Sequence, residues 1–297
     1  MAAPGTPETG LLERCHRNYV ETLWQYARSI PGAARRELPE ATWIRCGLPS
    51  SLTNIVFFTQ PSSATKESFR AARAFFGPKL PWRVLATGAQ ASEVGSVAVG
   101  LGFRAGSSEP GMILDPIGSI PRPPDFLTIR PVTGSESLTD FGAAWSEAFR
   151  FPRWVLPVAL PQPLSDDPGR QAQNRLLVGY VDGLPVGCSA VTITERVAGI
   201  VNVGTVRSAR GKGIGTAMTW AAADAGRALG AEVSYLAATP MGCGVYERMG
   251  FRRVAEYPSW HLPFGFFRVL GALWTVRRLA RERRRNPPSS AAATRGP

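Results

Sequence analysis

Apolar residues in the first part of the chain follow two different periods. A spacing of three to four residues, typical of one face of an amphipathic helix, predicts helices over residues 11–29, 69–76 and 92–103. Short apolar runs rich in β-branched and aromatic residues predict strands at 41–47, 53–59, 82–87 and 112–115. The predicted order is helix, two strands, helix, strand, helix, strand.

A proline-rich segment then interrupts the pattern, and a similar order of elements follows it. Residues 116–125 contain four prolines, which do not pair in the interior of a sheet, so we place a linker at 117–125. The turn 182–185 predicts a β-hairpin. The other predicted elements are strands at 126–132, 199–206 and 232–238, helices at 137–149 and 214–229, a short helix ending at Gly250, and two closing strands.

The repeated order indicates the α/β (α+β) class, with two domains at 11–116 and 126–263. Each is expected to hold a mixed, mostly antiparallel sheet flanked by helices. Residues 1–10, which are small, polar and rich in proline and glycine, are expected to be disordered.

Composition adds a basic tail to this picture. Of the 297 residues, 44% are hydrophobic and 19% charged, as in soluble globular proteins, and no apolar run reaches the roughly 20 residues that span a bilayer. The formal net charge is +12, and residues 264–297 hold eight arginines against one glutamate. We expect a basic helix that docks on the protein body and ends in a disordered tail. Contact of this segment with RNA or an anionic membrane is the alternative.

Cysteine spacing and the first thirty residues bear on compartment and metal binding. The four cysteines form no CxxC pair, which argues against a metal site or a disulfide framework. The first thirty residues lack the basic start and apolar core of a secretory signal. We therefore expect a cytoplasmic protein with reduced thiols and no metal.

The strongest chemical signal is the turn 210–215, which leads from an apolar strand into an apolar helical pattern. A Walker phosphate loop has four residues before its Gly-Lys pair and a Ser or Thr after the lysine, whereas Gly213 follows Lys212 here. A dinucleotide fingerprint has the spacing GxGxxG, and this turn reads GxGxG. Two interpretations remain. One is a tight strand-to-helix turn without a ligand, and the other is a turn whose backbone amides converge on a pyrophosphate at a helix start, with no Cβ in the way.

Two motifs in the second half resemble a known superfamily. The sequence RGKGIG at 210–215 resembles motif A, Q/R-x-x-G-x-G/A, of the GNAT superfamily of acetyl-CoA-dependent N-acetyltransferases. The sequence VYERMGF at 245–251 resembles its second landmark, a tyrosine near the start of a short helix followed by Gly-Phe. They stand in the family's order, and the resemblance covers about residues 126–262. It implies a sheet that splays after its fourth strand, with the pantetheine of acetyl-CoA lying in the gap.

The resemblance also implies roles for individual residues. Main-chain groups at Val203, Thr205 and Val206 would bind pantetheine and polarise the thioester carbonyl. Tyr246 would protonate the departing CoA thiolate as a general acid. The pyrophosphate would be bound by backbone amides, with two cationic side chains nearby, in the segment Arg210, Gly211, Lys212, Gly213, Ile214, Gly215 and Thr216.

Two features depart from the family pattern. Thr239 stands where many members have an asparagine seven residues before the tyrosine, and it can still hydrogen-bond the cofactor. The predicted strands 199–206 and 232–238 carry no carboxylate except Glu232 at the start of the second. The general base is therefore open between Glu195 and a water relay.

Three aromatic residues follow the first helix of the second domain. Family members often line the acceptor pocket at this place, so Phe149, Phe151 and Trp154 are acceptor-pocket candidates, with plain core packing as the alternative. Neither motif identifies the acceptor amine, because one fold serves many amines.

Two hypotheses follow. The first is a tandem GNAT N-acetyltransferase whose N-terminal copy is degenerate, since TQPSSATKES at 59–68 contains no glycine turn. That copy would shape the acceptor cleft or a homodimer interface. The second is a non-catalytic acetyl-CoA-binding or scaffold protein that uses its basic tail to bind RNA or an anionic membrane.

Overall fold

We describe the protein from a computed structural model. The residues that the structure describes are 7–28, 30, 32–48, 50–51, 53–59, 64–78, 80–88, 91–153, 156, 173–263, 277–278 and 281.

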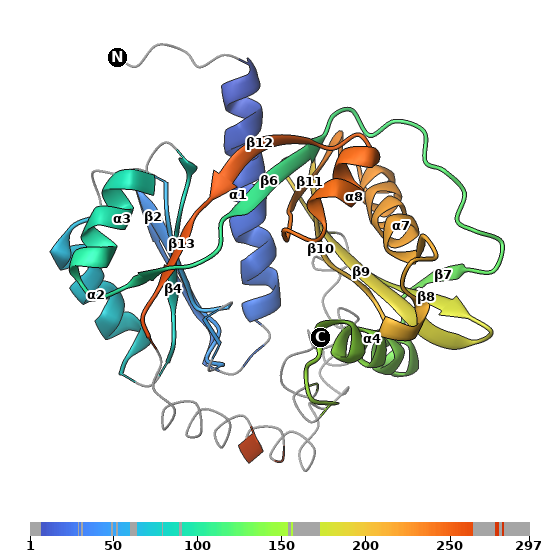
Figure 1. Cartoon of the computed structure of the whole chain (residues 1–297), viewed down its shortest axis with the longest axis horizontal. Helices are drawn as coiled ribbons and strands as arrows, with labels where there is room; N and C mark the ends of the chain where they lie inside the picture. Colours follow the sequence, from blue (N-terminus) through green and yellow to red (C-terminus); the bar gives the residue numbers. More distant parts are fainter. Residues whose placement is uncertain are drawn as a thin grey trace, which may run out of the picture.

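The N-terminal part of the chain opens with a long helix and continues as alternating strands and helices (Figure 1). Its elements are α1 (Pro7–Ala27), β1 (Ala34–Leu38), β2 (Ala41–Arg45), β3 (Ile55–Phe58), α2 (Lys66–Phe76), β4 (Arg83–Ala86), α3 (Ala91–Gly100), β5 (Arg104–Ala105) and β6 (Glu109–Leu114). Residues 117–125 then run without helix or strand, as the prolines predict.

The second part repeats the pattern with longer strands. Its elements are β7 (Thr128–Pro131), α4 (Ser135–Phe149), β8 (Asn174–Val181), β9 (Leu184–Thr194), β10 (Val197–Thr205), a 3₁₀ turn (Arg207–Ala209), α7 (Ile214–Ala228), β11 (Val233–Ala237), α8 (Cys243–Arg248), β12 (Arg252–Tyr257) and β13 (Ser259–His261). The described strands form two mixed sheets, ordered β1-β2-β3-β4-β13-β5 and β12-β6-β11-β10-β9-β8-β7.

The two sheets exchange a strand. β6 comes from the N-terminal part but lies between β11 and β12 of the second sheet, antiparallel to both. β13 comes from the end of the described second part but lies between β4 and β5 of the first sheet. In Figure 1 the red β13 accordingly stands among the blue strands. The predicted domains 11–116 and 126–263 require each sheet to be built from one side of residues 117–125. The observed sheets each contain a strand from the other side. The reason is that local sequence pattern fixes a strand but not its partner.

Helix α1 joins the two sheets. It runs between them in Figure 1. Asn18 donates its side-chain amide to the carbonyls of Thr192 (3.1 Å) and Val197 (2.9 Å) on strands β9 and β10. A Cβ on Gly199 would lie 2.1 Å from the Asn18 Oδ1 atom, so glycine lets the helix approach β10 this closely.

Strand β10 is covered on both faces. Gly199 faces α1, whereas its neighbour Ala198 faces α7, where a Cβ on Gly226 would lie 2.4 Å from the Ala198 Cβ. Successive residues of a strand point to opposite faces, so α1 and α7 pack on opposite sides of the second sheet. Strand β10, which carries part of the candidate site, is thus packed against a helix on each face of the sheet.

Several elements differ from the prediction. β1 was missed because its sequence, ARREL, shows no apolar alternation, and the strand lies at a sheet edge. β6 extends back to Glu109, beyond the predicted start at 112. Helix α1 begins at Pro7, within the range 1–10 expected to be disordered. Most of the predicted basic tail lies outside the described residues.

Two absences concern the described residues alone. None of their helices is both long and apolar enough to cross a membrane. They also contain no group of three or more His, Cys, Asp or Glu side chains able to hold a metal ion. The four cysteines are all described, buried and free of disulfides.

Candidate functional site

Strands β10 and β11 pair only at their starts. They run parallel from Val197 opposite Val233 to Gly199 opposite Tyr235, and no pairing follows along the rest of either strand. A cavity of about 1090 Å³ opens at this splay and reaches across to α1 and the first sheet. The splay that the family resemblance implies is confirmed.

A bulge in β10 decides which backbone groups face the cavity. Val201 pairs with Ala190 and Gly204 with Cys188, so two residues of β10 stand opposite one of β9. Asn202, in the bulge, has a φ of 54°, a left-handed conformation that asparagine tolerates well.

Two helices hold the bulge in place. The indole N–H of Trp145, on α4, donates to the Asn202 Oδ1 atom at 3.3 Å. Tyr26, on α1, hydrogen-bonds the same side chain. Both contacts orient the stretch of β10 that lines the cavity.

Beyond the bulge, alternate residues of β10 face the splay. The amide N–H of Val206 donates to Val186 on the β9 side at 2.9 Å, and the carbonyl of Val206 accepts from Ala209. Val203 and Thr205 line the cavity, whereas Val206 is buried outside its lining. Because antiparallel pairing alternates along a strand, the main-chain groups of Val203 and Thr205 point toward the splay. Val206 is therefore removed from the candidate site.

The glycine turn presents open amides to the same cavity. Gly211 and Gly213 have φ angles of +78° and +77°, which L side chains rarely adopt. The first helical hydrogen bond of α7 runs from Ala217 N to Gly213 O at 3.0 Å. The amides that precede Ala217 in this first turn have no helical acceptor, and their partial positive charge suits an anion. The lining residues here are Gly211, Gly213, Ile214, Gly215 and Thr216.

The two cations of the turn do different things. The Arg210 guanidinium donates to the carbonyls of Thr205 (3.2 Å) and Ala148 (3.1 Å). It thus ties the turn to β10 and α4, and it lines the cavity. The Lys212 side chain is exposed and does not line the cavity, so its contribution to an anion is at most long-range.

Tyr246 faces the turn from the other wall. It lies on α8, whose start is held by Thr239: the Thr239 carbonyl accepts from Gly242 N at 2.9 Å, and its hydroxyl accepts from the same amide at 3.3 Å. Tyr246 and Thr239 both line the cavity. Burial raises the pKa of Tyr246 to about 12, although a hydrogen bond with Thr219 opposes the shift. The phenol is therefore protonated at neutral pH.

An aromatic wall lines another part of the cavity. The Trp145 and Phe151 rings stack with centroids 4.7 Å apart, and the Trp145 and Phe149 centroids are 6.0 Å apart. All three line the cavity. Trp154, the third predicted acceptor residue, lies outside the described residues.

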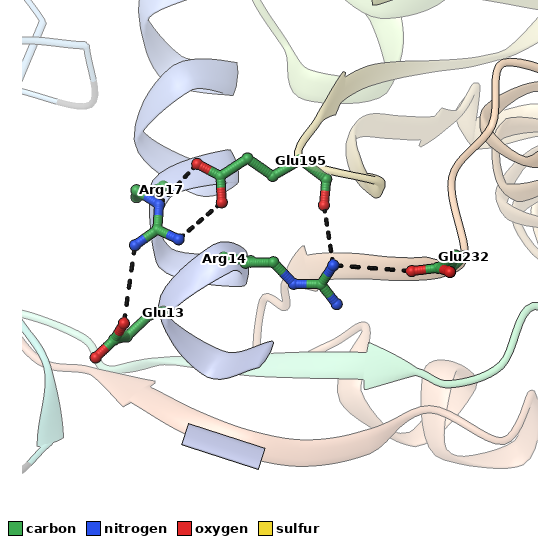
Figure 2. A network of polar contacts seen from close by, with 5 residues as sticks. All are labelled: Glu13, Arg14, Arg17, Glu195 and Glu232. Atoms are coloured by element: carbon green, nitrogen blue, oxygen red, sulfur yellow. Dashed lines mark hydrogen bonds and ion pairs between the residues drawn. The ribbon is translucent and has the colours of Figure 1, made fainter. Parts of the chain in front are cut away.

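Glu195 does not lie at the site. It occupies the turn between β9 and β10, at the end of β10 opposite the splay, and does not line the cavity. Figure 2 shows its carboxylate bound by the Arg17 guanidinium, with N–O distances of 2.8 and 2.7 Å, and this pairing lowers the Glu195 pKa. Glu195 joins α1 to the second sheet, so its candidacy as general base is wrong.

Sequence reasoning missed the wall that the N-terminal part contributes. Tyr19 and Leu23 of α1, Arg83 of β4 and Glu109 of β6 line the same cavity as Tyr246. The amphipathic period of α1 is the only sequence signal for any of these residues. Nothing in the sequence indicates Glu109, because strand exchange brings it to the cavity.

The described residues of the N-terminal part show no strand splay like that between β10 and β11. β3 and β4 are parallel and remain paired at all four positions, from Ile55 opposite Arg83 to Phe58 opposite Ala86. The helix between them, α2, has a capping box: the Thr65 hydroxyl accepts from the Ser68 amide at 3.1 Å, and the Ser68 hydroxyl accepts from the Thr65 amide at 3.0 Å. The first turn of α7 has no side-chain cap of this kind.

Three comparisons relate this geometry to known proteins. Residues 141–251 match the family model described as Acetyltransferase (GNAT) family. No curated protein sequence matches the chain.

Solved structures share the fold over most of the chain. A GCN5-related N-acetyltransferase from Kribbella flavida has a TM-score of 0.64 at 20% identity, covering 85% of this chain and 96% of its own. One from Sphaerobacter thermophilus has a TM-score of 0.55 at 17% identity, covering 75% and 80%. A tandem GNAT protein from the clavulanic acid biosynthesis pathway has a TM-score of 0.52 at 15% identity, covering 84% and 97%.

Proposed function

We propose that the protein transfers the acetyl group of acetyl-CoA to a primary amine by direct attack. The match of residues 141–251 to the family model described as Acetyltransferase (GNAT) family supports this. One observation carries the proposal: the open start of α7, the splay of β10 from β11 and the Tyr246 side chain all line one cavity. These are the anion site, the extended groove and the proton donor that this transfer requires.

The chain's own groups suit acetyl-CoA as a substrate. The open amides from Gly211 to Thr216 would bind its pyrophosphate at the helix start. The main-chain groups of Val203 and Thr205 that face the splay would pair with the pantetheine arm, and an amide there would polarise the thioester carbonyl. Neither Lys212 nor Val206 is needed for this binding.

Tyr246 supplies the proton of the departing thiolate. A carbon–nitrogen bond forms at the carbonyl, the carbon–sulfur bond breaks, and the phenolic proton passes to sulfur. With the Tyr246 pKa near 12 and a free thiol near 8.5, complete transfer to a solvated thiolate costs about 5 kcal/mol. Burial raises the pKa of the thiolate as well, which narrows this gap.

The N-terminal copy contributes a wall and no second cofactor site. Among the described residues, two observations support this: β3 and β4 stay paired along their whole length, and the α2 capping box occupies the Thr65 and Ser68 amides. The cavity continues from the cofactor groove to α1 and the first sheet, and we assign that continuation to the acceptor.

Two measurements test the proposal. Calorimetry with acetyl-CoA is expected to give one site per chain, and a panel of primary amines is expected to release free CoA thiol with at least one member. Two sites would contradict the degenerate copy. Tight acetyl-CoA binding without transfer to any amine would favour a non-catalytic acetyl-CoA-binding protein.

A further inference from the structure

A buried polar group closes the end of the cavity that α1 and the first sheet form. The Arg83 guanidinium donates to the Glu109 Oε1 atom at 2.7 Å, and the Tyr19 hydroxyl donates to the Glu109 Oε2 atom at 3.1 Å. The three residues come from β4, β6 and α1, and all three line the cavity. They meet only because β6 is exchanged into the second sheet.

The carboxylate is the more open member of this group. The Glu109 side chain is 21% exposed, against 10% for Arg83, and Tyr19 is buried. Each carboxylate oxygen has two acceptor positions, and the described residues occupy one on each. Among these residues, one acceptor position per oxygen is left for a ligand.

Glu109 is also the single carboxylate among the cavity-lining residues that the structure describes. The described cations in the lining are Arg83, Arg210 and Arg248. Arg210 donates to backbone carbonyls at the cofactor turn. Within the described lining, negative charge is thus confined to Glu109, which is far in sequence from the two cofactor motifs.

This point lies beside the splay. Ala238 N, just past the end of β11, donates to the Pro110 carbonyl at 2.8 Å, and Ala237 is registered with Gly111. Glu109 directly precedes Pro110, so its backbone adjoins the end of β11, in the part of that strand that no longer pairs with β10. A ligand group held by Glu109 is thereby in the same cavity as Tyr246.

We propose that Glu109 binds the ammonium group of the acceptor and that the acceptor is a primary amine with an apolar body. The inference rests on the proposed acetyl transfer. Arg83 and Tyr19 hold the carboxylate in position through one hydrogen bond each, and a carboxylate accepts strong hydrogen bonds from an ammonium group. Leu23, Leu48 and the Trp145–Phe149 wall offer the body of the amine apolar surface in the same cavity.

Glu109 acts as an anchor and takes no proton in the reaction. The bound ammonium releases one proton to water and attacks as the neutral amine. The second proton, lost as the amide forms, passes through water to the phenolate that Tyr246 becomes when it protonates the thiolate. The contribution of Glu109 is therefore to acceptor affinity and to selection of amines over neutral or acidic analogues of the same shape.

The test compares three ligands that share one apolar body. They are 2-phenylethylamine, 2-phenylethanol and 3-phenylpropanoate, titrated calorimetrically into the full-length protein saturated with CoA. The wild type is expected to bind the amine about tenfold or more tightly than the alcohol, the factor typical of a hydrogen bond between charged groups. Glu109→Gln is expected to reduce this preference to within about twofold and to leave CoA affinity unchanged.

The control is Glu256→Gln on neighbouring β12. Glu256 accepts a hydrogen bond from Ser108 at 2.6 Å but does not line the cavity, so the amine preference should persist. Equal wild-type affinity for amine and alcohol overturns the inference, and so does an unchanged preference in folded Glu109→Gln. If that variant fails to fold, the wild-type comparison of the three ligands still decides.

The same titrations separate the two proposals. Absence of CoA binding by the wild type overturns the proposed acetyl transfer and this inference with it. CoA binding together with tighter binding of the alcohol or of 3-phenylpropanoate overturns the role of Glu109 alone.

Discussion

Residues of the candidate site fall into two groups. In one, the backbone conformation determines which amino acid is required, and in the other, the neighbouring side chains determine what the residue does. Gly211 and Gly213 have positive φ and no atom within 4 Å of an added Cβ, so conformation alone requires glycine there. Such a requirement is local and can be read from the motif. Glu195 and Glu109 are the opposite case, because a carboxylate's role depends on what the fold places beside it.

Replacement of Tyr246 by Phe tests the proton donor. General acid catalysis typically contributes roughly 10²–10⁴-fold, so kcat should fall by about 10²-fold or more while acetyl-CoA affinity changes little. Because the Tyr246 pKa is near 12, its protonated form persists to alkaline pH and kcat should show no loss from this group below about pH 10. Steady-state kinetics over pH 7–10 measure both effects.

Tyr180→Phe is the matched control. Tyr180 donates to Asp140 at 2.9 Å and does not line the cavity, so its loss should leave kcat unchanged. An unaltered kcat in Tyr246→Phe would remove Tyr246 from the mechanism.

At the scale of elements, two equivalent helices differ at their first turns. α2 begins with a reciprocal Thr65–Ser68 capping box, whereas α7 begins at Gly213 without a side-chain cap. Capping satisfies the amides that an anion would otherwise bind. The sequence predicted the missing glycine turn at 59–68, whereas the Thr65–Ser68 capping box became visible only in the structure.

Gly213→Ala is expected to weaken acetyl-CoA binding. A left-handed conformation costs an L residue about 1–2 kcal/mol, so the turn should relax and move its amides. The dissociation constant, measured by calorimetry, should rise about tenfold. Gly230→Ala carries the same strain at the other end of α7, with φ +89°, and should lower stability without changing affinity. Equal affinity in the two variants would contradict the assignment of the turn.

The whole molecule depends on α1 and the exchanged strands. His16 of α1 contacts Phe57 of the first sheet and Tyr257 of the second, with ring centroids 6.4 and 5.6 Å apart. Tyr19 stacks on the same Tyr257 ring at 4.9 Å. The two sheets therefore share one aromatic cluster, and they are expected to unfold together.

Acid should weaken this junction. Burial lowers the pKa of His16 to about 4 from an unfolded value near 6.5, so between these values the unfolded chain binds more protons. Stability should therefore fall as pH drops from 6.5 to 4, by about 3 kcal/mol from this residue. Urea unfolding at pH 4.5 and pH 7 should show this decrease in the free energy of unfolding in the wild type but not in His16→Gln. The other histidine, His261, is exposed, so His261→Gln should show the same decrease as the wild type.

Separated halves should associate. Residues 126–263 lack β6, which lies between β11 and β12, so expressed alone they should be insoluble or unfolded. Co-expressed segments 1–120 and 121–297 should copurify, because each supplies a strand to the other's sheet. Soluble, cooperatively folded 126–263 in calorimetry would contradict the dependence on exchange.

The sequence by itself determined the elements with strong periodicity, the glycine turn and the Tyr246 helix, because each depends on contacts or φ angles within a few residues. It also showed that residues 59–68 contain no glycine turn, which predicts that the N-terminal copy does not bind acetyl-CoA. Only the tertiary structure decided which sheet β6 and β13 join, and hence that Glu109 and Arg83 line the cavity. Glu195 was misassigned for the same reason, because its partner Arg17 lies 178 residues away in the sequence and only packing brings the two together.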